Sequence, residues 1–581
     1  MQHPTRVVSI TLVLALAGAC VDQRDRATPA QNENGPREQP VTVVDEAIAG
    51  GSPRPLPAPE PDIDRTWHKV VPRAAQATPV PSLEQAALSA KYTADYAPGR
   101  AQAPVDREHY IDYPDNGVKQ VAQEPVSTFS IDVDTAGYAN VRRMLAAEGR
   151  LPPSDAVRLE EMINYFSYDY TPPASVEQPF SIHTELAPAP WSDSHQLLQV
   201  GLKGFEPQLE ERPAANLVFL VDVSGSMRAP NKLGLVKKSL RLLVNSMNAD
   251  DRIALAVYAG AAGTVLESTP GNQKAKILAA IDGLEAGGST HGSAGIKLAY
   301  ALAQQHRIEG GINRVIIASD GDMNVGTVNI EALKDLVQRQ RDSGIALTTL
   351  GFGAGNYNYA LMEQIADVGN GNAAYIDTLR EAQKVLVNEM QSTLLTIAAD
   401  VKIQVEFNPA VVSEYRLIGY ENRLLAREDF TNDKVDAGDI GAGHTVTALY
   451  EIVLAGSGGE RIPQLRYGDR DRAAPAPQHN GELAHVKLRY KQPGAQRSQL
   501  ISRVVRRDSL RGDIGEGSTD LRFAASVAGF GQLLRGGDFT GQWSYDDALA
   551  LARGARGDDP HGYRSELVHL IELAQSLSSG S

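Results

Sequence analysis

The stretch Leu217-Val218-Phe219-Leu220-Val221-Asp222-Val223-Ser224-Gly225-Ser226-Met227 decides the fold. Five apolar residues of strand length come first, and helical spacing begins near Lys232. We therefore expect Asp222, Ser224 and Ser226 in a tight turn at the carboxyl end of a buried strand, where open α/β sheets place ligand sites. One carboxylate and two hydroxyls are hard oxygen donors, so this turn predicts a site for a divalent cation such as Mg²⁺.

Two segments further along the chain carry matching donors. Thr290 ends the run Gly287-Gly288-Ser289-Thr290, and Asp320 follows a second apolar run at residues 315–318. This order, D-x-S-x-S, then T, then D-G, resembles the metal-ion-dependent adhesion site of von Willebrand factor type A domains. Each segment alone is also explained by helix capping, but the three together favour a metal site.

The resemblance implies a complete ligand set. In that family the hydroxyls touch the metal directly or nearly so, the carboxylates bind directly or through water, and a partner protein's Asp or Glu fills the sixth position. We expect Mg²⁺, with Mn²⁺ or Ca²⁺ as alternatives. Carried over by position, the metal ligands are Asp222, Ser224, Ser226, Thr290 and Asp320.

The surrounding region, residues 216–395, alternates strand and helix. Repeated βα units with apolar strands predict an α/β, Rossmann-like fold with a doubly wound, mostly parallel sheet, the class to which the type A domain belongs. The expected strands are residues 217–221, 252–258, 264–266, 314–318, 346–351 and 373–376. The expected helices are residues 232–247, 273–284, 294–305, 330–343, 359–368 and 378–393.

Residues 106–205 are expected to form a small α+β domain. They resemble the von Willebrand factor-associated domain that precedes the type A domain in one bacterial family of exported proteins, through Phe129-Ser130-Ile131-Asp132-Val133-Asp134-Thr135 and Asn164-Tyr165-Phe166. Asp132 and Asp134 suggest a second metal loop, but the Gly and Glu that continue a calcium loop do not follow. We interpret them as carboxylates of a strand end and a turn.

Residues 397–581 are expected to form a C-terminal domain with strands first and helices later. Alternation predicts antiparallel strands at residues 401–407, 445–453 and 485–490, and helical spacing covers residues 502–534, 545–553 and 562–577. This segment resembles the domain of unknown function that follows the type A domain in the same bacterial family. The stretches that carry this resemblance are Gly419-Tyr420-Glu421-Asn422-Arg423 and Asp436-Ala437-Gly438-Asp439-Ile440-Gly441.

The N-terminal residues predict export and a lipid anchor. Residues 1–20 have the layout of a secretory signal peptide and end in Leu16-Ala17-Gly18-Ala19-Cys20, which resembles the bacterial lipobox. Cys20 is the single cysteine of the chain and has no partner for a disulfide, so lipidation explains it better than a chance cysteine. Residues 21–105, rich in Pro, Ala and Gln, predict a disordered tether. Val21 after the cysteine, where Asp would signal inner-membrane retention, favours the outer membrane of a Gram-negative bacterium, facing the periplasm.

The net charge of the chain and its lack of common enzyme motifs exclude some classes of function. The formal net charge of -15 over 581 residues argues against nucleic acid as a partner. The sequence contains no H-E-x-x-H, G-x-S-x-G or P-loop motif, so we expect no enzyme. We expect an envelope lipoprotein that binds a protein partner through its metal site. A metal-dependent hydrolase, or a scaffold with a non-essential metal site, is the alternative.

Overall fold

A computed structural model describes residues 108–175, 177–207, 212–288, 292–321, 330–389, 392, 394–463, 479 and 481–579. The expected signal peptide with Cys20, the expected tether and Thr290 lie outside the described residues. Within the described ranges, the helices are too short or too polar to cross a bilayer.

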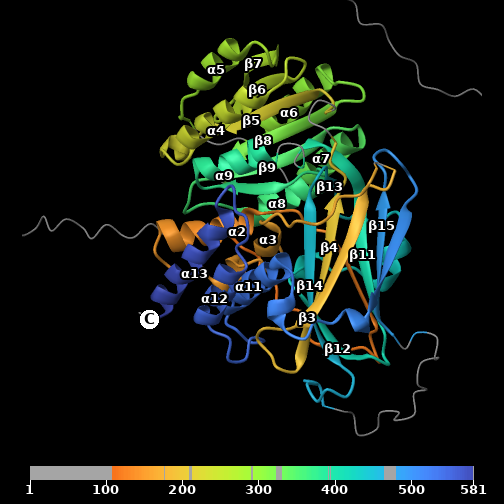
Figure 1. Ribbon diagram of the computed structural model, residues 1–581. Helices are drawn as coiled ribbons and strands as arrows, with labels where there is room; N and C mark the ends of the chain where they lie inside the picture. The colour runs from red at the N-terminus through yellow and green to blue at the C-terminus, as the bar shows by residue number, and fades with distance from the viewer. Residues whose placement is uncertain are drawn as a thin grey trace, which may run out of the picture. The chain divides into compact units, whose positions relative to one another are not determined.

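Strand β5 (Ala215–Asp222) lies inside a six-stranded sheet with the order β10-β9-β8-β5-β6-β7 (Figure 1). The strands pair in parallel except for β6 with β7. Every residue of β5 is buried, which explains its continuous apolar run. The expected doubly wound, mostly parallel sheet is therefore confirmed. Its other strands are β6 (Arg252–Tyr258), β7 (Ala262–Pro270), β8 (Ile312–Ser319), β9 (Ala346–Phe352) and β10 (Ala373–Ile376).

Side chains of β5 alternate between two hydrophobic cores, one on each face of the sheet. Leu217 and Phe219 contribute to the core shared with α4, α5 and α9, whereas Val218 and Leu220 contribute to the core shared with α6, α7 and α8. The helices on the first face are α4 (Leu233–Ser246), α5 (Lys274–Asp282) and α9 (Leu379–Gln383), which continues as a π-helical turn over Lys384–Asn388. Those on the second face are α6 (Gly292–Gln305), α7 (Ile330–Asp342) and α8 (Tyr359–Val368).

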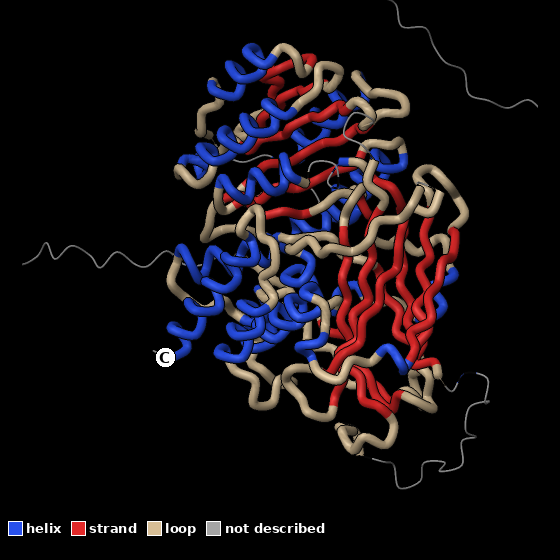
Figure 2. Tube along the Cα trace, in the orientation of Figure 1, coloured by secondary structure: helices blue, strands red, loops and turns tan. Residues whose placement is uncertain are grey.

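The segments before and after this α/β domain share two antiparallel sheets (Figure 2). One sheet has the order β1-β12-β14-β4-β3, and the other has the order β13-β11-β15-β16 with β2 also paired to β11. The sequence indicates two separate flanking units, but their strands pair directly, β4 with β14 and β2 with β11.

The strands of the N-terminal segment are β1 (Lys119–Gln120), β2 (Val126–Ser130), β3 (Phe180–Pro188) and β4 (His195–Gly204). Those of the C-terminal segment are β11 (Thr396–Phe407), β12 (Val412–Ile418), β13 (Ile440–Gly441), β14 (Thr445–Leu454), β15 (Glu482–Lys491) and β16 (Gln499–Arg506). Both sheets contribute to one core, with Phe129 and Val486 from one sheet and Leu198 and Tyr450 from the other.

Helices of the two flanking segments also pack together (Figure 1). The N-terminal segment contributes α2 (Ala136–Arg142), which continues as a π-helical turn, and α3 (Leu159–Asn164). The C-terminal segment contributes α11 (Thr519–Leu534), α12 (Tyr545–Gly554) and α13 (Tyr563–Ser579). Tyr138, Met162, Phe530 and Leu570 lie in their common core.

The helical spacing expected from residue 502 onward is wrong at its start. Gln499–Arg506 is strand β16, antiparallel to β15, and the helix begins only at Thr519. Most β16 side chains are exposed, so this edge strand lacks the apolar alternation that marks a half-buried strand.

Arg142 joins the N-terminal segment to both other parts of the chain. Its guanidinium donates hydrogen bonds to Asp377 Oδ2 at 2.8 Å, to Glu381 Oε2 at 2.8 Å and to Glu566 Oε1 at 2.9 Å. Asp377 and Glu381 belong to the α/β domain, and Glu566 lies on α13. The side chains of Arg142 and Glu381 are 6% and 1% exposed, so this ion-pair group is buried.

Substitution of Arg142 by Met should therefore lower the free energy of unfolding by about 3–5 kcal/mol, because Asp377 and Glu381 would stay buried without their counter-ion. Denaturation by urea measures the loss. Arg150→Met is the matched control, because the exposed pair Arg150–Glu148 should contribute at most about 1 kcal/mol. Equal effects of the two substitutions would contradict the assigned role of Arg142.

Candidate metal centre

The carboxylates of Asp222 and Asp320 lie at the same edge of the parallel sheet. Asp222 is the last residue of β5, and Asp320 follows Ser319, the last residue of β8. The register pairs Val221 with Ala318, so the two strands end side by side. Asp222 and Asp320 are both 0% exposed, and the Ser319 hydroxyl donates a hydrogen bond to Asp222 Oδ2 at 3.2 Å.

The turn after β5 adds two hydroxyls to these carboxylates. The backbone N–H of Ser224 donates to Asp222 Oδ1 at 2.8 Å, which folds the turn back onto the strand end. The hydroxyl oxygens of Ser224 and Ser226 are 2.9 Å apart. Ser224 is buried and Ser226 is exposed, so the hydroxyl pair extends from the strand end to the surface. The structure thus brings four of the five predicted ligands together.

The loop that leads to Thr290 is joined to this turn by its backbone. Gly287 N–H donates to the carbonyl of Val223 at 2.7 Å, and Gly225 N–H donates to the carbonyl of Gly288 at 3.1 Å. Gly288 has a φ of +86°, a conformation that favours glycine. Thr290 itself lies outside the described residues, and its role as a ligand stays a prediction.

The two carboxylates differ in their electrostatic surroundings. Burial raises the pKa of Asp222 above its ordinary value, and the charge of Asp320 acts in the same direction. Burial alone would also raise the pKa of Asp320, but the charge of Lys232 and hydrogen bonds from Lys232, Ser226 and Asn356 lower it. The hard oxygen donors at this edge fit the ligand preference of a divalent cation.

Sequence reasoning missed Lys232 and Asn356. Lys232 Nζ donates hydrogen bonds of 2.9 Å to both Asp320 Oδ2 and Asn356 Oδ1. Neither residue stands in the D-x-S-x-S, T or D-G segments, and Lys232 simply precedes the first residue of a helix. The sequence offers one signal, a lysine six positions after Ser226 at the end of the candidate turn, and such a lysine is more typical of a solvent-exposed helix start.

Comparison with known proteins places the chain in a family. Over 498 residues it is 48% identical to the uncharacterized protein YfbK of Escherichia coli strain K12, and the match covers 85% of this chain and 84% of that protein. The chain belongs to the YfbK family. Its residues 392–577 match the C-terminal region of uncharacterized protein YfbK, residues 216–389 match the von Willebrand factor type A domain, and residues 104–199 match the von Willebrand factor family.

More distant relatives share only part of this YfbK family chain. Inter-alpha-trypsin inhibitor heavy chain H3 of Pongo abelii is 27% identical over 271 residues, which are 43% of this chain and 30% of that protein. The uncharacterized protein sll0103 of Synechocystis sp. strain ATCC 27184 is 26% identical over 317 residues, 53% of this chain and 69% of that protein. A solved structure, von Willebrand factor type A from Catenulispora acidiphila, covers 70% of this chain and 91% of its own, with 15% identity and a TM-score of 0.37. The type A domain belongs to a class that commonly mediates protein interactions.

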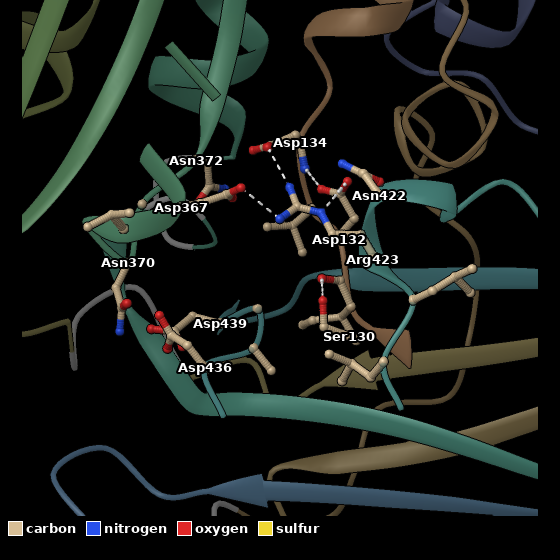
Figure 3. A pocket seen from close by; sticks show the side chains of 18 residues that line it. Ser130, Asp132, Asp134, Asp367, Asn370, Asn372, Asn422, Arg423, Asp436 and Asp439 are labelled. Carbon is tan, nitrogen blue, oxygen red and sulfur yellow. Dashed lines mark hydrogen bonds and ion pairs between the residues drawn. The ribbon is translucent and has the colours of Figure 1, made fainter. Parts of the chain in front are cut away.

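A second group of carboxylates surrounds Arg423, beside a cavity of about 270 Å³ (Figure 3). Arg423 donates to Asp132 Oδ2 at 3.0 Å, to Asp367 Oδ2 at 2.8 Å and to Asp134 Oδ2 at 3.3 Å. Asp132 also accepts a hydrogen bond from the backbone of Asp134, and Asp134 accepts one from Ala373. These contacts agree with the interpretation of Asp132 and Asp134 as turn carboxylates.

Asp132, Glu161 and Glu363 form a compact triad in which one oxygen of each lies within 4.8 Å of the others. Two arginines supply positive charge to it, because Arg158 Nη2 and Arg423 Nη2 lie 3.7 Å and 3.5 Å from Glu363 Oε1. We therefore interpret the triad as part of an ion-pair cluster rather than as a metal site. Burial, reinforced by the charge of Asp132, raises the pKa of Glu161 to about 8.

This raised pKa predicts how stability depends on pH. Between about pH 4.5 and 8 the folded protein holds a proton on Glu161 that the unfolded chain has lost, so stability should fall as pH rises through this window. The contribution of this group is at most about 1.4 kcal/mol per pH unit. Glu161→Gln, which imitates the protonated form, should reduce the slope in urea denaturation measured at several pH values. The exposed Glu309→Gln is the control, and identical slopes in both variants would refute the assignment.

Proposed function

We propose that this YfbK family protein is an envelope lipoprotein whose type A domain binds an acidic residue of a partner protein through Mg²⁺. The observation that carries the proposal is the convergence of Asp222, Ser224, Ser226 and Asp320 at one sheet edge. Thr290 is the proposed fifth ligand, and Mn²⁺ or Ca²⁺ are the alternative ions.

The ligand chemistry explains why the proposed metal ion would have a coordination position free for a ligand from another protein. Three hydroxyls and two carboxylates supply five oxygens to a divalent ion, and the octahedral preference of Mg²⁺ leaves a position for one more oxygen. A side-chain carboxylate from another protein would supply this sixth oxygen. The exposed position of Ser226 supports access to this position from outside.

The metal assignment is tested by Asp222→Ala. Loss of this carboxylate should raise the dissociation constant for Mg²⁺ and Mn²⁺ by at least about a hundredfold, because even outer partners of metal ligands change affinity by ten- to a hundredfold. Titration calorimetry on the full chain measures it, and circular dichroism checks the fold. Asp250→Ala removes an exposed carboxylate just before β6 and should leave metal affinity unchanged. Wild-type affinity in the Asp222 variant would remove the basis of the proposal.

The interaction half of the proposal is tested with the partner. Proteins captured from envelope extracts by the full chain in Mg²⁺ should be released by EDTA and should not be captured by the Asp222 variant. Partners that stay bound in EDTA would show that the metal site is not the interface.

The anchor is tested at Cys20. Acylation at this thiol predicts that the wild-type protein incorporates labelled palmitate and, with several acyl chains, partitions into detergent. Cys20→Ser should do neither, because it lacks the thiol. Fractionation of the envelope should place the protein in the outer membrane. Recovery of the full-length wild-type chain in the cytosol alone would refute export.

A further inference from the structure

The side chain of Lys232 lies inside the candidate metal centre. Lys232 is 7% exposed, although it precedes the first residue of α4 at the end of an otherwise accessible turn. Its Nζ is 2.9 Å from Asp320 Oδ2 and 2.9 Å from Asn356 Oδ1, so two other segments of the chain hold it. A lysine at a helix start normally extends into solvent, because burial of its ammonium group is costly.

The loop after β9 is shaped to admit this side chain. Gly353 has a φ of +81°, and a Cβ placed on it would overlap Cγ and Cε of Lys232. The aliphatic part of Lys232 therefore passes over a position where the chain carries only a hydrogen atom. Gly353 thus leaves room for the aliphatic part of Lys232, and Asn356 accepts a hydrogen bond from its ammonium group.

We propose that Lys232 is an internal counter-ion of the metal centre, a positioning residue that weakens binding of the metal and strengthens binding of an acidic ligand to that metal. This inference rests on the proposed metal site and deepens it. The two carboxylates contribute two negative charges and Lys232 contributes one positive charge. A bound divalent ion then leaves the centre with a net charge of +1, which one incoming carboxylate neutralises. Without Lys232 the same ion would neutralise the centre, and an incoming carboxylate would leave an unbalanced negative charge.

Two opposite shifts distinguish this role from a merely structural one. In Lys232→Met, the affinity of the full chain for Mn²⁺ should rise at least about tenfold, the size of effect that one neighbouring charge has on proton binding by a carboxylate. The affinity of the Mn²⁺-loaded protein for acetate, the simplest carboxylate probe, should fall by a similar factor. Calorimetry measures the first constant, and the decrease in water proton relaxation as acetate displaces water from Mn²⁺ measures the second.

Lys238→Met is the matched control, because it removes the same charge from the exposed face of the same helix. It should change neither constant. Lys232→Gln is a second variant that removes the charge but can still donate a hydrogen bond to Asp320, and it should show the same two shifts if Lys232→Met does not fold. Thermal unfolding adds an independent readout: Lys232→Met should melt below wild type in EDTA, and Mn²⁺ should stabilise the variant more than it stabilises wild type.

The outcomes separate this inference from the proposed function. Wild-type protein that binds no Mn²⁺ would overturn both. Wild-type protein that binds Mn²⁺, with both affinities lowered or both unchanged in Lys232→Met and Lys232→Gln, would overturn the counter-ion role while the metal site stands. Opposite shifts in the two constants, found in the Lys232 variants and not in Lys238→Met, would establish it.

Discussion

The parallel pairing of β5 with β8 is the constraint on which the candidate site depends. Both strands are buried along their whole length, so polar side chains can serve a ligand only where the strands end. The register makes them end side by side, and it brings Asp222 and Asp320 to one edge although they are far apart in the sequence. The turn that holds Ser224 and Ser226 is attached to the same edge by its hydrogen bond to Asp222.

The structure also buries several charged side chains. The buried cations Arg142, Lys232 and Arg423 each donate hydrogen bonds to carboxylates. Isolated charges inside a protein are costly, whereas charges with several hydrogen-bonded partners are tolerated. Arg142 and Arg423 each contact carboxylates of the α/β domain and of a flanking segment. The two flanking segments are joined to each other by their shared sheets, and these arginines join them to the α/β domain. The described residues accordingly belong to one compact unit.

This arrangement bears on how the type A domain would work in the YfbK family. The site edge is formed by the ends of β5 and β8. The flanking segments contact the α/β domain elsewhere: Arg142 binds Asp377, just after β10, and Glu381 on α9, Arg423 binds Asp367 on α8, and Asp134 accepts from the start of β10. The flanking segments therefore hold the domain at residues other than the four that converge at the candidate metal centre.

The elements of the α/β domain were predictable because each one is marked locally. Strands such as β6 and β10 begin and end at the predicted residues, since largely buried strands are nearly continuous apolar runs between polar turns. Edge strands do not have this property. The sequence wrongly predicts a helix at most of strand β16, because most of its side chains face solvent and apolar residues do not alternate along it. The pairing of β4 with β14 was not predictable at all, because antiparallel strands in two distant segments carry no local mark of their partner.

The sequence by itself determined the chemistry of the candidate site. A carboxylate and two hydroxyls at alternate positions after an apolar run indicate oxygen ligands at a strand end, because the turn is local and its donors are adjacent in the chain. Only the tertiary structure decided that Lys232 lies among those ligands. Its contacts with Asp320 and Asn356 exist because the sheet places the ends of β8 and β9 beside the start of α4. The periodicity of the sequence indicates which face of an element is buried. It does not indicate a contact between three loops, because that contact depends on how the sheet places the loops in space.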